Sequence, residues 1–349
     1  MSSQMKIAIV LINLGTPDSP EVSDVRKYLR EFLMDSRVMD MPFIKRWLLV
    51  NCIIAPFRAP KSAELYRHLW TSQGSPLKAH GFQLKEQLQK LLGKNYYVSL
   101  AMRYQNPSIR CALEELKPAC PEEIIVIPLY PQYASASTGS TVEKFFEEIK
   151  SWEIIPQIRV LSHFFEHPLF LEVLVEIGRK YMDQCPYDHF LFSYHGLPES
   201  QIKKSAVDNY CQMNDRCCSV YHQKNSFCYR AQSFATSRLL AEKLGLRSNQ
   251  YTVCFQSRLG KTPWIRPYSD HVVKDLAKKN IKKILCFSPS FVADCLETTI
   301  EIGVEYKKLF LDCGGERLDL VESLNTHPQW VQCLKTLILE KSASTVLTT

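Results

Sequence analysis

Glycine is scarce in this chain, which has only 12 among its 349 residues. Neither the G-x-G-x-x-G fingerprint of dinucleotide-binding folds nor a complete phosphate loop occurs, although Gly260-Lys261-Thr262 matches the end of the latter. The G-x-S-x-G elbow of serine hydrolases is also missing. These absences disfavour a nucleotide cofactor and acyl-transfer chemistry.

Long hydrophobic runs are missing as well. The longest apolar stretch, Trp47–Phe57, is interrupted by Asn51 and Pro56 and is well short of the roughly 20 residues that span a bilayer. Arg58 and Lys61 lie just beyond it. The stretch is therefore either a buried helix or an exposed apolar lip that contacts an apolar ligand or a membrane surface.

Basic residues outnumber acidic ones, which gives a net charge of +7, but they do not form long runs. Aromatic residues are not interleaved with them, so nucleic acid is disfavoured as a partner. The N-terminus lacks the apolar core of a signal peptide. We therefore expect a cytoplasmic protein.

Cysteine is plentiful, with 13 residues, but the number is odd and most are scattered. In a reducing compartment they are expected to be mainly thiols. Four of them, Cys211, Cys217, Cys218 and Cys228, fall within one short polar segment, residues 205–230. Because this segment has no apolar periodicity, these four are not expected in the core. Their spacing is not the paired C-x-x-C of a zinc ribbon, and zinc, free thiols, a disulfide or an iron–sulfur cluster all remain open.

Short apolar runs alternate with helix-length segments along the whole chain, as in βαβ units with a parallel sheet covered by helices. The pattern occurs twice. We therefore expect an α/β protein with two doubly wound halves, residues 1–165 and 166–349, and a cleft between them. The predicted strands are Lys6–Leu14, Tyr96–Ala101, Ile124–Pro128, Gln157–Leu161, Phe190–Tyr194, Tyr251–Phe255, Lys283–Ser288 and Arg317–Val321. The predicted helices include Gly81–Leu92, Pro107–Leu116, Ser140–Ser151, Pro168–Met182, Ala231–Leu244 and His271–Lys279.

Ionisable residues follow two of these strands directly, at the edge where open α/β sheets bind ligands. One strand is followed by His195, whose imidazole exchanges protons near neutral pH. The other precedes a predicted helix with four carboxylates at spacings of three, four and four residues, which places them on one face. Imidazole and carboxylates together suit proton transfer, divalent metal handling or both. The four carboxylates are Asp294, Glu297, Glu301 and Glu305.

Motifs spread over nearly the whole chain resemble those of the ferrochelatase family, whose members insert Fe2+ into a porphyrin. The resemblance implies a two-lobed, Rossmann-like chelatase fold with the porphyrin in the cleft. The matching segments are LINLGTP at Leu11–Pro17, GSP at Gly74–Pro76, RYQNP at Arg103–Pro107, PLYPQYASASTGS at Pro128–Ser140, SYHGLP at Ser193–Pro198, FQSRLGKTPWIRP at Phe255–Pro267, SPSFVADCLET at Ser288–Thr298 and ESLN at Glu322–Asn325.

The resemblance also implies roles for particular residues. His195 lies next to the pyrrole nitrogens, either as proton acceptor or as metal donor, and Glu297 is its partner across the cleft. The other three carboxylates match a polar path to solvent. The residues implied to line the porphyrin pocket are Arg103, Tyr104 and Trp264, and those implied to contact its propionates are Arg58, Lys61 and Ser75.

The resemblance favours protoporphyrin IX and Fe2+ as substrates, with coproporphyrin as the alternative porphyrin. A haem-binding or metal-binding protein that has kept the fold without turnover is a further alternative. Family members with an iron–sulfur cluster often carry its cysteines in a C-terminal extension, but here only Cys333 lies that far along, and the tail Lys341–Thr349 has no cysteine. Other bacterial members have an internal cysteine segment, so we predict that Cys211, Cys217, Cys218 and Cys228 hold a [2Fe–2S] cluster. A peripheral contact with the inner face of the membrane is expected at the apolar lip.

Overall fold

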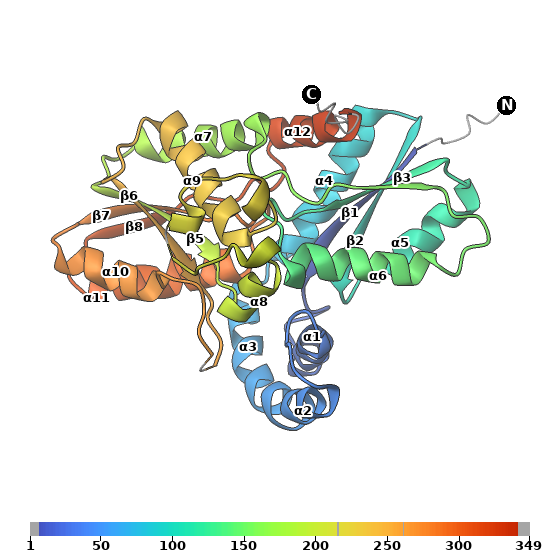
Figure 1. Ribbon diagram of the computed structural model, residues 1–349, viewed down its shortest axis with the longest axis horizontal. Helices are drawn as coiled ribbons and strands as arrows, with labels where there is room; N and C mark the ends of the chain where they lie inside the picture. The colour runs from blue at the N-terminus through green and yellow to red at the C-terminus, as the bar shows by residue number, and fades with distance from the viewer. Residues whose placement is uncertain (1–6, 215, 261, 341–349) are drawn as a thin grey trace.

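The computed structural model describes residues 7–214, 216–260 and 262–340. Two four-stranded sheets form its centre, and helices cover them (Figure 1). The first sheet has the strand order β2-β1-β3-β4 and the second has β6-β5-β7-β8. The strands are β1 (Ile7–Gly15), β2 (Tyr96–Tyr104), β3 (Glu123–Pro128), β4 (Gln157–Val160), β5 (His189–His195), β6 (Tyr251–Gln256), β7 (Lys283–Phe287) and β8 (Arg317–Leu320).

Every strand pair in the two sheets is parallel. In the first sheet Ile7 of β1 lies opposite Tyr96 on one side and Glu123 on the other. In the second sheet β5 is central in the same way, between β6 and β7. The two sheets thus repeat one topology, which confirms the predicted α/β class with two doubly wound halves. All eight predicted strands are present, and no end shifts by more than three residues.

Most helices cover the sheets, but residues 22–69, which contain α1, α2 and α3, project away from them (Figure 1). The α-helices are α1 (Val22–Met34), α2 (Phe43–Leu48), α3 (Ala55–Leu69), α4 (Pro76–Leu92), α5 (Ile109–Leu116), α6 (Ser140–Ile149), α7 (Pro168–Met182), α8 (Glu199–Lys204), α9 (Tyr229–Leu244), α10 (Ser269–Lys278), α11 (Lys307–Asp312) and α12 (Pro328–Leu339). Short 3-10 turns are η2 (Lys117–Ala119), η4 (Val207–Asn209), η5 (Arg216–Cys218) and η6 (Gln223–Asn225).

Three segments are π-helical: η1 (Leu49–Ile54), η3 (Ser135–Gly139) and η7 (Leu296–Tyr306). The π-helix is rare, usually a single turn, and frequent at functional sites. At 11 residues, η7 is unusually long for this class. It follows β7 at the carboxyl ends of the strands of the second sheet, where the acidic helix was predicted.

One continuous hydrophobic core joins the two halves. It contains Ile9 and Leu100 from the first sheet together with Phe192 and Leu285 from the second. Trp330 of α12 belongs to the same core and has no exposed surface. The C-terminal helix thus packs across the predicted boundary near residue 165, a division that stays a prediction.

Two glycines allow backbone segments to approach closely at the site. Gly15 has φ of +111°, and a Cβ there would lie 2.0 Å from the carbonyl oxygen of Tyr104. A Cβ on Gly196 would lie 2.7 Å from the carbonyl oxygen of Gln256. Side chains at these positions would push apart the strand ends that carry the candidate site.

Candidate active site

The ends of β5 and β6 connect directly to the acidic helix η7. Gln256 lies opposite His195 in the strand register. Its Nε2 donates to the carbonyl oxygen of Glu297 at 2.8 Å and to Oε2 of Glu301 at 3.1 Å. Its Oε1 accepts from Ser193 Oγ at 2.8 Å. Only 1% of Gln256 is exposed. One buried amide therefore joins the histidine strand to the carboxylate helix.

The His195 ring has a defined orientation. Its Nδ1 lies 2.6 Å from the carbonyl oxygen of Gly196. A carbonyl oxygen only accepts, so Nδ1 carries the hydrogen in this contact, and Nε2 of the neutral ring is left as an acceptor. The His195 backbone is held too, because its carbonyl oxygen accepts from Tyr229 OH at 2.9 Å and its N–H donates to Ser290 Oγ at 3.4 Å. Phe291 lies beside the ring, with centroids 6.5 Å apart.

The acidic row differs from the prediction at its first member. Asp294 precedes the helix instead of lying on it. Its Oδ2 accepts from Asn325 Nδ2 at 2.7 Å and its Oδ1 from the Ser323 N–H at 3.0 Å. Both oxygens are thus used in fixing the neighbouring loop, so the prediction of four carboxylates on one α-helical face is wrong. Three remain, four residues apart along a π-helix, whose wider turn still keeps such positions on one side.

Two of the three carboxylates have identifiable partners. Glu301 accepts from the Ser257 N–H at 2.9 Å and from Tyr306 OH at 2.7 Å, and Ser257 Oγ donates to it as well. Glu305, farther along the helix, is exposed but has the protein on one side. The partial loss of solvation there, together with the nearby Glu301 charge, raises the pKa of Glu305, whereas the Lys61 charge lowers it.

The N-terminal half presents two buried tyrosines to Glu297. Tyr28 of α1 and Tyr66 of α3 pack with their rings 6.4 Å apart. Burial raises the pKa of each phenol well above its usual value, and the Glu297 charge raises it further. Both phenols therefore stay protonated at neutral pH. Glu297 accordingly lies where the two halves of the chain meet.

Arg103 is anchored at the end of β2. Its Nη2 donates to Asp35 Oδ2 at 2.6 Å, and its Nε donates to Ser140 Oγ at 2.6 Å. Burial alone would oppose ionisation of Asp35, but hydrogen bonds from Ser140 and the Arg37 N–H, together with the Arg103 charge, lower the pKa of this carboxyl. The side chains of Arg103 and Asp35 are 13% and 5% exposed, so this ion pair is largely shielded from water.

The two predicted aromatic pocket residues are placed differently. Tyr104 has no exposed surface, and its OH donates to Asp35 Oδ2 at 2.9 Å. It therefore supports Arg103 from behind instead of offering a face to a ligand. Trp264 is partly exposed and lies against Gly196, next to His195, where a glycine Cβ would be 3.2 Å from the indole. Its Nε1 donates to the Leu259 carbonyl at 2.9 Å.

The three predicted propionate contacts also differ in exposure. Arg58 and Lys61 are exposed on α3. Ser75, which directly precedes α4, is 2% exposed, and its hydroxyl has no hydrogen-bond partner among the described residues. The two cations are thus accessible to an anionic ligand, whereas the serine hydroxyl is enclosed.

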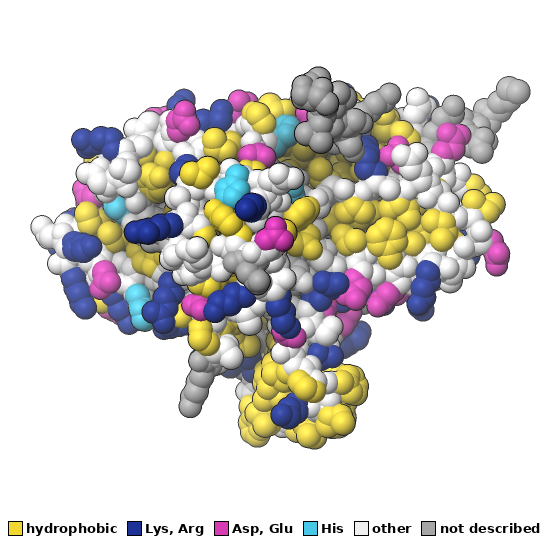
Figure 2. Space-filling view, viewed as in Figure 1, with side chains coloured by type: hydrophobic (Ala, Val, Ile, Leu, Met, Phe, Trp, Pro, Cys, Tyr) yellow, Lys and Arg dark blue, Asp and Glu magenta, His cyan; other side chains and the backbone are white. Residues whose placement is uncertain are grey.

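The stretch Trp47–Phe57 is largely exposed, which favours the lip over the buried helix. The exposed apolar side chains of α2, η1 and the start of α3 are called the apolar lip from here on. They form an apolar surface at the tip of the projecting segment (Figure 2). Its members, with exposed fractions, are Phe43 at 61%, Ile44 at 72%, Trp47 at 45%, Leu48 at 51%, Ile53 at 55% and Phe57 at 80%.

The cysteine segment is packed more tightly than expected. Cys217, Cys218 and Cys228 are 7%, 2% and 8% exposed and belong to the main core, so the expectation that they lie outside it is wrong. The sulfurs of Cys217 and Cys218 are 3.7 Å apart. A contact with Cys228 raises the pKa of Cys218 and lowers that of Cys228. Burial, with Cys217 and Cys218 nearby, raises the pKa of Cys211. Neighbouring thiols of the segment therefore contact one another in pairs, because tertiary packing overrides the polar character of the segment.

The part of the chain that the structure describes offers few other sites. No group of three or more His, Cys, Asp or Glu side chains is arranged there to hold a metal ion. No helix in the described ranges is long and apolar enough to cross a membrane.

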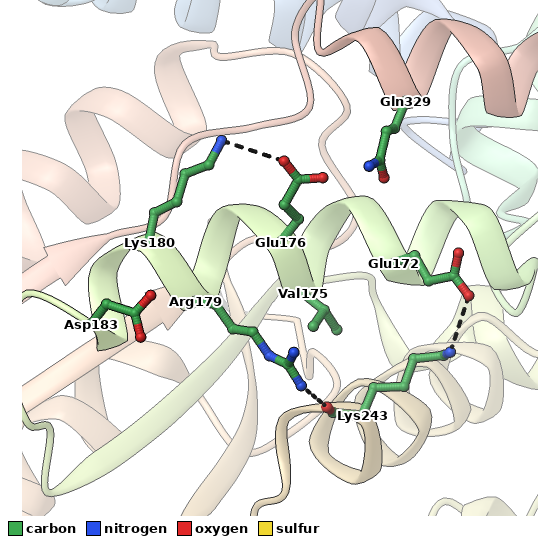
Figure 3. Close-up of a pocket in the computed structure, with 8 residues that line it drawn as sticks. All are labelled: Glu172, Val175, Glu176, Arg179, Lys180, Asp183, Lys243 and Gln329. Atoms are coloured by element: carbon green, nitrogen blue, oxygen red, sulfur yellow. Dashed lines mark hydrogen bonds and ion pairs between the residues drawn. The ribbon is translucent and has the colours of Figure 1, made fainter.

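A surface groove of about 560 Å³ lies away from the candidate site, where α7 meets α9 and α12 (Figure 3). Its charges are already matched. Glu172 pairs with Lys243 at 3.5 Å, and Glu176 pairs with Lys180 at 3.7 Å. The groove therefore has no excess of one charge and none of the residues predicted to act in chemistry.

The comparison with known families decides the assignment. The ferrochelatase family model matches residues 6–342. This chain belongs to the ferrochelatase family. Ferrochelatase of Legionella pneumophila strain Lens is 45% identical over 337 residues, which cover 97% of this chain and 100% of that protein. Ferrochelatase of Coxiella burnetii strain Dugway 5J108-111 is 44% identical, over 94% of this chain and 92% of that protein.

A solved structure supports the fold assignment. SirB from Bacillus subtilis with Fe3+ matches with a TM-score of 0.51 at 14% identity, over 97% of this chain and 96% of that one. This likeness confirms the two-lobed chelatase fold. Membership of the ferrochelatase family supports haem-type metal chelation by an enzyme.

Three residues with clear structural roles were not singled out from the sequence. Gln256 lies within a matched motif at a strand end, a position that could have drawn attention to it. Asp35 gave no signal, because its partners Arg103 and Tyr104 are almost 70 residues away in sequence. Tyr229 follows a cysteine that drew attention for a different reason.

Proposed function

We propose that this ferrochelatase inserts Fe2+ into protoporphyrin IX, a lyase reaction that completes haem biosynthesis and releases the two pyrrole protons. One observation carries the proposal. The His195 ring, with Nε2 free as an acceptor, stands at a strand end that Gln256 ties to the Glu297 helix. A base and a carboxylate on one rigid scaffold are what metalation requires, since no redox change or further cofactor takes part.

His195 and Glu297 divide the chemistry between them. In the proposed reaction Nε2 of His195 takes the pyrrole protons as the metal enters from the side of Glu297. The alternative division, in which His195 delivers the metal and Glu297 takes the protons, uses the same two groups. Glu301 and Glu305 extend from Glu297 along η7 and form the polar path for Fe2+ or protons. Asp294 serves this path by fixing the loop at its start.

The porphyrin would lie between the two halves. Trp264 beside Gly196 supplies a flat apolar face next to His195, and Arg103 supplies a fixed cation from the opposite half. Arg58 and Lys61 are exposed on α3 and suit the propionates by charge. Tyr104 and Ser75 are enclosed, so we assign them to support of the pocket wall.

A direct comparison of substrates tests this function. Fe2+ insertion is measured anaerobically with protoporphyrin IX and with coproporphyrin, at equal enzyme and metal concentrations. We expect the higher kcat/KM with protoporphyrin IX. A higher value with coproporphyrin would assign the alternative porphyrin. Stoichiometric haem binding without turnover on either porphyrin would favour the non-catalytic binding protein instead.

The apolar lip is proposed to touch the inner face of the membrane, from which an apolar porphyrin could enter the cleft. Six exposed apolar side chains at the tip of one projecting segment support this contact. The contact is peripheral, because side chains of this kind lie in the interface without spanning it.

The cysteine segment is proposed to hold a [2Fe–2S] cluster. The proposal is based on donor chemistry: the sulfurs of Cys217 and Cys218 are 3.7 Å apart, and a contact with Cys218 lowers the pKa of Cys228, which favours the thiolate that binds iron. No three of the described thiols are arranged here as a metal site, so binding of a cluster would have to draw the four together. The residues that would hold it are Cys211, Cys217, Cys218 and Cys228. Such a cluster would exchange single electrons or brace the segment; none of the four belongs to the catalytic motifs.

A further inference from the structure

The carbonyl group of His195 has an unusual hydrogen-bond partner. β5 pairs with β7 only as far as Phe192 opposite Phe287, so His195 extends beyond that part of the sheet. Its carbonyl oxygen accepts instead from the phenol of Tyr229, at 2.9 Å. A side chain from α9 thus replaces a strand on this flank of the catalytic loop.

Tyr229 is well placed to hold this position. It is the first residue of α9 and is only 6% exposed. The hydrogen bond itself shows the direction, since the carbonyl oxygen of His195 only accepts and the Tyr229 hydroxyl must donate. The N–H of the same peptide unit, that of Gly196, donates to the Gln256 carbonyl at 2.8 Å. The peptide that joins His195 to Gly196 is therefore held at both its carbonyl and its N–H.

This fixed backbone controls the state of the ring. The imidazole Nδ1 donates to the carbonyl of the next residue, Gly196, at 2.6 Å. If the His195–Gly196 peptide turned, Gly196 would move and the contact between Nδ1 and the Gly196 carbonyl would lengthen. The ring hydrogen could then move from Nδ1 to Nε2. The atom proposed to accept the pyrrole proton would then be occupied.

Tyr229 also joins the active site to the cysteine segment. It directly follows Cys228, whose N–H donates to the Asn225 carbonyl at 2.9 Å. The Asn225 side chain is 4% exposed and donates to the carbonyls of Cys217 at 3.0 Å and Val220 at 2.8 Å. The fold of the cysteine segment therefore determines where the first turn of α9 begins.

We infer that Tyr229 is a positioning residue for His195 and that it couples the packing of the cysteine segment to metal insertion. This inference rests on the proposed function. It gives the segment a role in the reaction although its four thiols belong to none of the catalytic motifs.

The primary test is Tyr229→Phe, which removes only the hydroxyl. Loss of one neutral hydrogen bond is expected to lower kcat by about five- to tenfold and to leave the porphyrin KM within about twofold. The matched control is Tyr194→Phe. Tyr194 has no exposed surface, and the variant loses a hydrogen bond of 2.8 Å between its hydroxyl and Ser237, not one to the histidine loop. Equal changes of kcat in both variants would refute a positioning role.

A spectroscopic readout separates this inference from the proposed function. In 15N-labelled protein, the two ring nitrogens of His195 report the tautomer directly. We expect the Nδ1–H form in the parent and in Tyr194→Phe, and a mixture in Tyr229→Phe. If the parent lacks chelatase activity, the proposed function fails, and the tautomer comparison still decides the role of Tyr229. If Tyr229→Phe does not fold, Cys218→Ser takes its place, because the inference makes Tyr229 the link between the cysteine segment and His195; an unchanged tautomer and an unchanged kcat there would overturn the inference.

Coupling to the cysteine segment is tested by combining variants. Cys218→Ser should lower kcat in the parent but have a clearly smaller further effect in the Tyr229→Phe background, because both changes act through the same contact. Cys120→Ser, at an exposed thiol far along the first half, is the control and should change neither. Independent, multiplicative losses for Cys218→Ser and Tyr229→Phe would contradict the coupling.

Discussion

The ion pair between Arg103 and Asp35 gives a quantitative test of how the pocket wall is built. Asp35→Asn keeps the size of the side chain and removes its charge. Because the Arg103 side chain is only 13% exposed, the variant leaves a largely buried cation without its counter-charge. Breaking such a pair usually costs about 3 kcal/mol or more. At roughly 2 °C per kcal/mol for a chain of this size, we expect Tm to fall by about 6 °C.

The pH dependence of this difference follows from the lowered pKa of Asp35. A carboxyl whose pKa is depressed in the folded state stabilises the fold above its unfolded pKa, about 3.9, and loses that contribution as the pH falls through the folded value. The Tm difference between parent and Asp35→Asn should therefore be constant from pH 8 to pH 5 and shrink below about pH 4.

Differential scanning calorimetry across this pH range measures both quantities. Glu143→Gln is a suitable control, since Glu143 pairs with Arg37 on the surface with 48% of its side chain exposed. That variant should change Tm by no more than about 2 °C. A similar small change for Asp35→Asn at pH 7, or a difference that grows as the pH falls, would refute the reasoning.

Three other predictions concern the remaining parts of the site. Glu297→Gln should lower kcat by about 10²-fold or more, and Glu305→Gln by less than about tenfold, in steady-state Fe2+ insertion; equal mild losses would reduce the row to a solvated surface. Replacing Leu48 and Phe57 with Ser should weaken binding to anionic vesicles in a flotation assay and raise the porphyrin KM without changing Tm; unfolding with unchanged vesicle binding would count against the lip. Protein purified without oxygen should show visible absorption that dithionite bleaches, with about two irons per chain, and Cys218→Ser should lose it. Colourless, fully active parent protein would end the cluster hypothesis.

Strand positions were predictable because strands buried on both faces of a parallel sheet are continuous apolar runs. The run at Leu285–Phe287, for example, is fully buried in β7. The first turn of the acidic helix was not predictable. Asp294 is held outside it by Asn325 and Ser323, and no periodicity within residues 294–305 reveals partners about 30 residues away.

Exposure was the other property that the sequence left undetermined. The polar segment around Cys217 and Cys218 is covered because α9 packs against it, whereas the apolar stretch around Phe57 remains uncovered. The composition of the cysteine segment predicted an exposed segment, which is wrong. The composition of the stretch around Phe57 was compatible with either a buried helix or an exposed lip. Whether a segment is buried depends on which element packs on it, and that is a tertiary property. The hydrogen bonds of Arg103 could not be predicted for the same reason, because its partners Asp35 and Ser140 come from distant parts of the chain.

The central claim is that His195 handles the pyrrole protons, and one measurement tests it most directly. Single-turnover insertion of Fe2+ into bound protoporphyrin IX is compared between the parent and His195→Ala, with porphyrin binding measured in the same samples. We expect the insertion rate to fall by about 10²-fold or more while the porphyrin Kd stays within a few fold, since the change removes a base and little packing. A variant that binds porphyrin normally and inserts iron at more than about a tenth of the parent rate would contradict the claim.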